Sequence, residues 1–123
     1  MMQSAAQAYK KVATQISSPR ELEADLLLQA ASKLQAVVDK WDGNKRDNYH
    51  PALDYNRRLW VILFTAVTSP DSPLPVETRQ NVANLGLFVM NQTVSMMTNP
   101  QREHLGSLIN INRELAAGLL GRA

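Results

Sequence analysis

Cysteine is absent from the 123-residue sequence. Its absence excludes a disulfide framework, thiol catalysis and cysteine-ligated zinc. Long apolar runs are missing too, because no segment approaches the ~20 consecutive apolar residues that cross a bilayer. The N-terminal residues also do not join a basic region to an apolar core. We therefore expect a cytoplasmic protein that does not insert into a membrane.

An excess of one charge is also lacking, since 13 basic and 11 acidic residues leave a formal net charge of +2. This small excess argues against direct binding of nucleic acid. Catalytic patterns are missing as well: His50 and His104 stand alone, and there is no His-Glu-x-x-His pattern, nucleophile elbow or glycine-rich phosphate loop. We expect no enzymatic activity, no catalytic residues, no metal site and no cofactor.

No segment shows the strict polar–apolar alternation of a β-strand. Apolar residues recur instead at spacings of three and four, which is typical of amphipathic helices. The pattern predicts four long helices, over residues 19–41, 50–69, 75–97 and 100–121, and a short N-terminal helix over residues 4–16. The fold class is therefore all-α, a small helical bundle in which residues 1–123 form a single domain.

Several residues mark where these helices begin and end. Ser18, Pro19 and Glu21 have the spacing of a capping box with proline in the first helical position. Residues 44–48 are polar, and we interpret them as a loop before a helix that begins near His50. Residues 99–100, Asn-Pro, predict the start of the last helix, and Gly121 predicts its end.

The stretch 52–60, ALDYNRRLW, combines an apolar stripe with an amide and two guanidinium groups. Asn56 interrupts the stripe that Leu53 and Trp60 share. A buried amide without a partner costs about 1–3 kcal/mol, so Asn56 needs either a partner inside the protein or an open face. Asn112 interrupts the stripe of the last helix in the same way, so the two asparagines could satisfy each other inside the bundle.

The alternative is that the residues around Asn56 and Asn112 bind a partner molecule. The candidate partner-binding residues are then Tyr55, Asn56, Arg57, Arg58, Trp60, Asn112 and Arg113. We interpret the tryptophans as anchors of the core, whereas Tyr49 and Tyr55 could line a surface groove. Met90, Met96 and Met97 fit a core or an irregular partner surface.

The order of several short motifs resembles the FlaF family of bacterial flagellar biosynthesis proteins over nearly the whole chain. The motifs are Ala-Tyr at 8–9, SPRELEA at 18–24, ALDYNRRLW at 52–60, Leu-Pro at 74–75, NLG at 84–86, ININR at 109–113 and Gly-Leu at 118–119. The resemblance implies a role in flagellin production and export, with flagellin as the partner of a dedicated chaperone. It implies no catalytic residues.

A chaperone of this kind would hold an amphipathic flagellin segment in an apolar groove. We expect that groove between the helices at 50–69 and 100–121, with the N-terminal helix as its cover. The alternative function is regulation of flagellin expression, together with a flagellar translational regulator or with flagellin mRNA. For RNA, the candidate basic surface is made of Lys40, Lys45, Arg46, Arg57 and Arg58.

Overall fold

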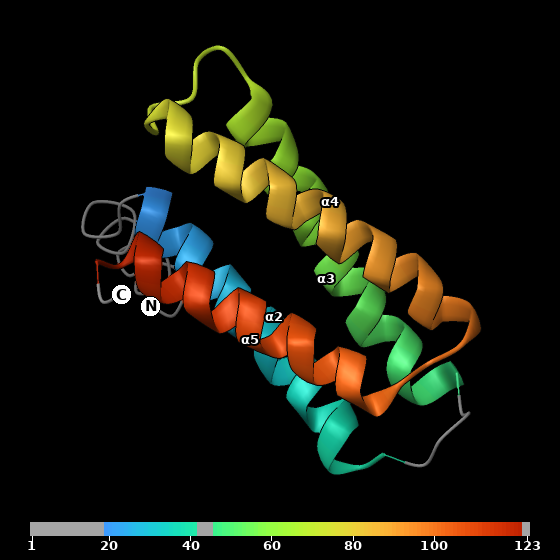
Figure 1. The fold of residues 1–123 in the computed structure, drawn as a ribbon. Helices are drawn as coiled ribbons and strands as arrows, with labels where there is room; N and C mark the ends of the chain where they lie inside the picture. Colours follow the sequence, from blue (N-terminus) through green and yellow to red (C-terminus); the bar gives the residue numbers. More distant parts are fainter. Residues whose placement is uncertain (1–18, 42–45, 122–123) are drawn as a thin grey trace, which may run out of the picture.

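The computed structural model describes residues 19–41 and 46–121. All the regular secondary structure in these two ranges is α-helical, which confirms the predicted fold class. The helices are α2 (Pro19–Asp39), α3 (Arg46–Thr68), α4 (Val76–Thr98) and α5 (Arg102–Leu119), shown in Figure 1. The predicted N-terminal helix over residues 4–16 lies outside the described residues.

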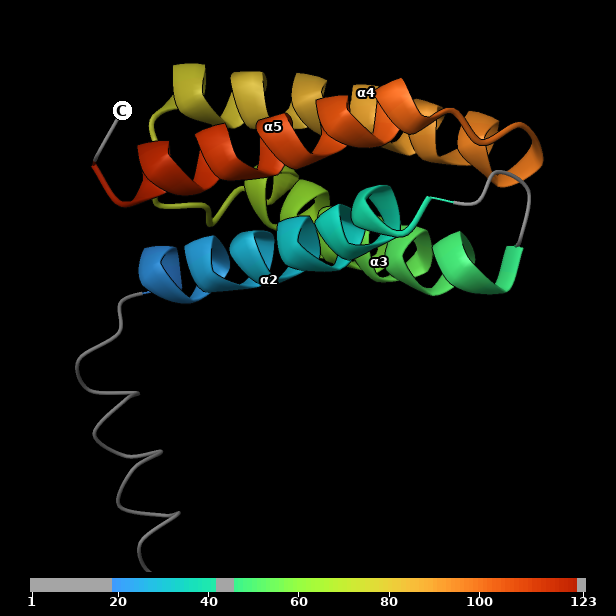
Figure 2. The same ribbon diagram turned by 90° about the horizontal axis from the view of Figure 1, so that it is seen from below.

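The four helices run up and down around a common core. Helices α2 and α3 form one layer and α4 and α5 the other (Figure 2). Helix α2 packs most extensively against α5, and α3 against α4, whereas α4 and α5 make the fewest contacts of any neighbouring pair. Helices α3 and α5 therefore occupy opposite corners of the bundle.

The core contains the stripe that the spacing of α3 predicts. Leu53, Asn56, Trp60, Leu63 and Val67 are all buried. Their recurrence at intervals of three and four places them on one face of the helix, and burial of that face holds α3 in the bundle. The other helices contribute small and medium-sized apolar side chains, among them Leu27, Leu34, Val89, Leu105 and Leu108.

Two helix starts differ from the sequence prediction. Helix α3 begins at Arg46, so residues 46–48 are helical and not part of a loop. Pro51 lies inside the helix and removes one backbone hydrogen bond, a loss that α3 tolerates near its N-terminal end. Helix α5 begins at Arg102, and Asn99 is the C-cap of α4 with its N–H bonded to the Ser95 carbonyl.

Gly86 explains the close contact of α3 with α4. A Cβ atom at position 86 would lie 3.2 Å from Cδ2 of Phe64 and 3.6 Å from Cε3 of Trp60. Because glycine has no side chain, the α4 backbone can approach these two rings closely. This contact fixes which residues of each helix lie on the outer side of the α3–α4 pair.

Candidate partner-binding surfaces

The two asparagines and Trp60 form a chain of hydrogen bonds across the core. The Trp60 indole Nε1–H donates to Oδ1 of Asn112 at 2.9 Å, and Asn112 Nδ2 donates to Oδ1 of Asn56 at 2.7 Å. All three side chains are fully buried. The asparagines thus satisfy each other inside the bundle, which is the first of the two interpretations of the sequence.

One donor of this hydrogen-bond network remains unpaired. Nδ2 of Asn56 is buried and has no hydrogen-bond partner in the structure. The Asn56 amide nitrogen therefore pays a desolvation cost on burial that no hydrogen bond offsets, unlike the hydrogen-bonded groups of Trp60 and Asn112. A partner could touch Asn56, Trp60 or Asn112 only if the bundle opened, so their predicted binding role has no access in this conformation.

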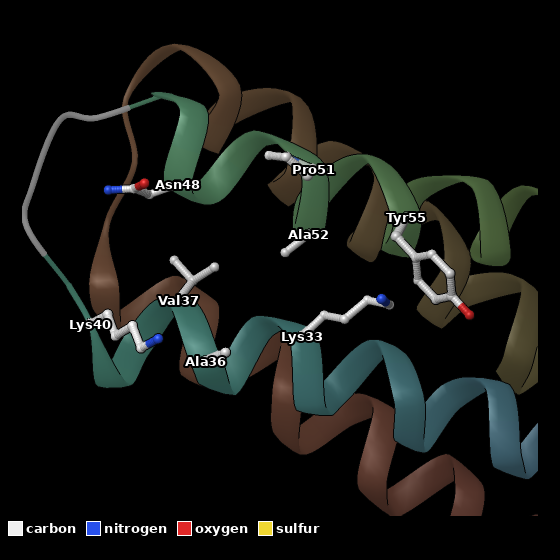
Figure 3. Close-up of a pocket in the computed structure, with 8 residues that line it drawn as sticks. All are labelled: Lys33, Ala36, Val37, Lys40, Asn48, Pro51, Ala52 and Tyr55. Atoms are coloured by element: carbon white, nitrogen blue, oxygen red, sulfur yellow. The ribbon is translucent and has the colours of Figure 1, made fainter.

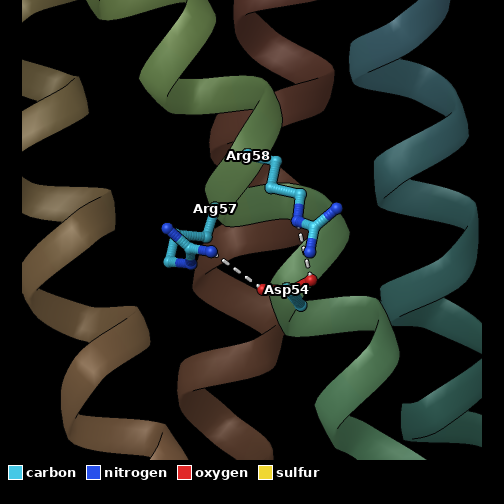
Figure 4. A network of polar contacts seen from close by, with 3 residues as sticks. All are labelled: Asp54, Arg57 and Arg58. Atoms are coloured by element: carbon cyan, nitrogen blue, oxygen red, sulfur yellow. Dashed lines mark hydrogen bonds and ion pairs between the residues drawn. The ribbon is translucent and has the colours of Figure 1, made fainter.

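The arginines next to Asn56 lie outside the core (Figure 4). Asp54 accepts a hydrogen bond from Nη2 of Arg57 at 3.0 Å and pairs with Nε of Arg58 at 2.9 Å. The hydrogen bond from Arg57, together with the positive charge of both arginines, lowers the pKa of Asp54. Arg57 leaves α3 on the side that faces α4, whereas Arg58 is more exposed, at 73% of its side chain against 40%.

The sequence contains an Asn-Arg pair at 56–57 and another at 112–113, and the two pairs do not form one surface. Asn56 and Asn112 meet in the core, but Arg113 is exposed on α5, at the corner opposite α3. Arg57 and Arg113 therefore leave the bundle from different corners. The structure brings the two amides together and not the two arginines.

Tyr55 lines a groove between α2 and α3 (Figure 3). This α2–α3 groove has a volume of about 800 Å³ and is lined by Lys33, Ala36, Val37, Lys40, Asn48, Pro51, Ala52 and Tyr55. The Lys33 ammonium lies 4.9 Å from the centre of the Tyr55 ring, within the range of a cation–π contact. The expectation of a groove at Tyr55 is correct, whereas Tyr49 is buried in the core.

The groove that we expected between the helices at 50–69 and 100–121 is not found in the described ranges. These helices, α3 and α5, are diagonal, and buried side chains from both meet between them. That prediction is wrong because it treated the interrupting amides as signs of an open face. The proposed cover, residues 4–16, lies outside the described residues.

Helix α4 carries a second apolar stripe whose central part is exposed to solvent, while its end residues Ala83 and Met97 also pack against the core. Its buried stripe is Val82, Gly86, Val89, Thr93 and Met96. One position after each of these comes a residue of what we call the α4 outer stripe: Ala83, Leu87, Met90, Val94 and Met97. Leu87 is 52% exposed and Val94 is 63% exposed, while the other three are half-buried.

The α4 outer stripe lies beside α3. Gly86 contacts Trp60 and Phe64, so Leu87 and Val61, each one position further along its helix, turn to the outer side of that contact. Val61 is itself exposed. The apolar surface therefore extends from α4 onto the neighbouring helix.

This stripe was not among the sequence predictions, although the sequence carries a signal for it. Residues 80–101 contain no charged side chain, and the five stripe residues are spaced by four, three, four and three. That alternation is the seam of a coiled coil. It was overlooked because the buried stripe alone accounts for one amphipathic face.

None of the described helices is long and apolar enough to span a membrane. In the same two ranges, no three histidine, aspartate or glutamate side chains gather into a metal-binding group. Two surfaces of the described ranges are therefore considered for a partner, the α4 outer stripe and the lysine-bordered α2–α3 groove.

The comparisons with known proteins agree with the motif order. A family model described as flagellar protein FlaF matches residues 5–119, a range that contains all four described helices. Neither the curated proteins nor the solved structures give a match to the chain. The chain therefore belongs to the FlaF family of flagellar proteins, and its role lies in the biogenesis of the flagellum or the regulation of that process.

Proposed function

We propose that the protein binds an amphipathic terminal segment of flagellin and acts as its cytoplasmic chaperone before export. The α4 outer stripe is the binding site. The observation that carries the proposal is the solvent exposure of Leu87 and Val94 within a seam of coiled-coil spacing. A flagellin helix with its own apolar seam would pack along this stripe and be prevented from polymerising.

The spacing supports a helix as the ligand. Apolar side chains that alternate at intervals of four and three remain on one side of a helix for several turns. An incoming helix can therefore contact Leu87, Met90 and Val94 in sequence, with the accessible parts of Ala83 and Met97 at the two ends. The methionines suit such a site, since their flexible thioether side chains adapt to the shape of the partner.

The surroundings of the stripe also support binding of an apolar seam. The centres of protein interfaces are depleted in charged residues, and residues 80–101 have none. The nearest described cation on α3 is Arg57, which extends toward α4 and remains 40% exposed. Its charge is already balanced by Asp54, so the surroundings of the stripe favour an apolar partner.

The alternative function, regulation of flagellin expression through RNA binding, is less well supported by the described charged residues than flagellin binding is by the stripe. Arg57 and Arg58, both assigned to a basic RNA-binding surface, are paired with Asp54. Of the other residues assigned to that basic surface, Lys40 lines the α2–α3 groove. The side chains of Lys45 and Arg46 are not among those that the structure describes. Salt separates the two functions, because RNA binding weakens steeply with salt and apolar binding does not.

The test measures the affinity of purified flagellin for the wild-type protein and for the variant Leu87→Glu/Val94→Glu by isothermal titration calorimetry. Removal of either flagellin terminus identifies the segment that binds. We expect the variant to bind about tenfold more weakly or worse, since burial of an unpaired carboxylate easily exceeds the 1.4 kcal/mol of a tenfold change.

The matched control is Leu22→Glu/Leu28→Glu. These residues are 57% and 37% exposed and lie on α2, which does not contact α4. The control should bind as tightly as wild type. If the control and the stripe variant lose affinity equally, or if flagellin with both termini does not bind at all, the proposal is wrong.

A further inference from the structure

The α2–α3 groove has a distinct chemistry from the α4 outer stripe. Its floor is made of small apolar residues, among them Ala36, Val37 and Ala52. Two lysines lie at its edge, Lys33 on α2 and Lys40 directly after the end of α2. Among the residues whose side chains the structure describes, no carboxylate lines it. A ligand that matches this surface needs an apolar body and negative charge.

Both lysines are accessible to such a charge, and the Lys33 ammonium also lies over the Tyr55 ring. Lys33 and Lys40 are exposed, and within the described ranges neither is joined to a carboxylate by an ion pair. The nearest acidic neighbour in the sequence, Asp39, accepts a hydrogen bond from Nε2 of Gln35 at 2.9 Å. The charge of both ammonium groups is thus available to a partner at the groove.

The spacing of the lysines identifies the form of the ligand. Lys33 lies on α2, and Lys40 directly follows the last residue of the helix, with its N–H still bonded to the Ala36 carbonyl as in a helix. The seven-residue separation therefore corresponds to about two helical turns, or roughly 10 Å. A second helix that lies along the groove repeats at the same interval. Alanines in the floor permit its backbone to approach closely, while Tyr55 and Pro51 bound the groove on the α3 side.

We infer that the α2–α3 groove is a second docking site, and that its occupant is a helical segment of a partner protein with two acidic side chains seven residues apart. The acidic side chains pair with Lys33 and Lys40, and small apolar residues between them contact the floor. This site is independent of the proposed flagellin site on α4, so the protein can hold two helices at once.

The probe is a fluorescein-labelled synthetic helix of alanine and leucine with glutamates seven residues apart, and its matched control carries glutamines at those positions. Fluorescence anisotropy with the full chain at low ionic strength measures the affinity. The glutamate peptide should bind about tenfold more tightly than the glutamine peptide, a gain that falls as salt is added. Amide chemical-shift changes should concentrate at Val37, Ala52 and Tyr55.

A charge exchange tests the role of the lysines. The variant Lys33→Glu/Lys40→Glu should lose the glutamate peptide and bind a peptide with lysines at the same two positions, while its circular dichroism remains that of wild type. Arg20→Glu/Arg102→Glu, which reverses two exposed charges that do not line the groove, should leave the affinity unchanged. Equal affinity for the glutamate and glutamine peptides, no binding of either, or shifts confined to α4 would overturn the inference.

Failure of this site and failure of the flagellin proposal are distinguishable. The lysine variant should bind flagellin like wild type, because the α4 outer stripe is unchanged. Loss of flagellin binding in the lysine variant, with its fold intact, would show that the two surfaces serve one ligand and would remove the claim of independence.

Discussion

Removal of the Asn112 amide should destabilise the bundle far more than removal of the Asn56 amide, although both side chains are fully buried. Asn112 is the middle member of the chain, since its Oδ1 accepts from Trp60 and its Nδ2 donates to Asn56. Asn112→Ala therefore leaves two further buried groups without partners, Nε1 of Trp60 and Oδ1 of Asn56.

The magnitude follows from the number of unpaired groups. In the wild type, the hydrogen-bond chain of Trp60, Asn112 and Asn56 contains one unpaired buried group, Nδ2 of Asn56. At about 1–3 kcal/mol for each buried unpaired group, Asn112→Ala costs roughly 2–6 kcal/mol before any cavity is counted. Asn56→Ala removes the unpaired Nδ2 and leaves Nδ2 of Asn112 unpaired, so the polar terms nearly cancel and a small cavity cost remains.

The double variant gives the sharpest test. Asn56→Ala/Asn112→Ala leaves only Nε1 of Trp60 unpaired, so adding Asn56→Ala to Asn112→Ala should restore stability. Urea unfolding monitored by circular dichroism measures the free energy of unfolding of all four proteins in a double-mutant cycle. If the two losses simply add, the hydrogen-bond chain does not control the stability of this core.

Three further predictions concern single positions. Trp60→Ala should lower the free energy of unfolding by about 3–5 kcal/mol in urea titrations, because it opens a cavity and unpairs Oδ1 of Asn112. Burial raises the pKa of Glu23 above 4.5, although the charge of Arg20 opposes this shift. The unfolded protein therefore loses this proton at a lower pH than the folded protein, so the folded state becomes less stable as pH rises above 4.5. Glu23→Gln should melt higher than wild type at about pH 7 and equally at about pH 3; a higher melt at both would refute the burial effect. The pKa of Asp54 is lowered from 3.8, so Asp54→Asn should be less stable than wild type above pH 3.8, and the difference should vanish in acid.

The sequence predicted the helices more reliably than their ends. Leu53, Trp60 and Val67 repeat at helical spacing, and such repeats determine which face is buried whatever the neighbouring helices are. The start of α3 was misplaced because Pro51 is typical of a helix start and residues 46–48 carry no apolar stripe. Local preference could not show that α3 extends one turn further and buries Tyr49.

The candidate site was predicted only in part. The sequence showed that Asn56 needs a partner and that Asn112 was a candidate, yet only the diagonal placement of α3 and α5 shows that both amides face the same core. The α4 outer stripe depended on which side of α4 meets α3, which Gly86 decides by its contact with Phe64. The α2–α3 groove likewise needs residues far apart in the chain, Lys33 and Tyr55, to come together.

The most direct measurement of flagellin binding at α4 uses methionine methyl groups labelled with carbon-13. Met90 and Met97 belong to the α4 outer stripe, whereas Met96, next to them in the sequence, is fully buried in the core and serves as an internal control. Addition of unlabelled flagellin should shift the methyl resonances of Met90 and Met97 and leave that of Met96 nearly unchanged. Binding of flagellin without a shift of Met90 or Met97 would contradict the assignment of α4 as its site.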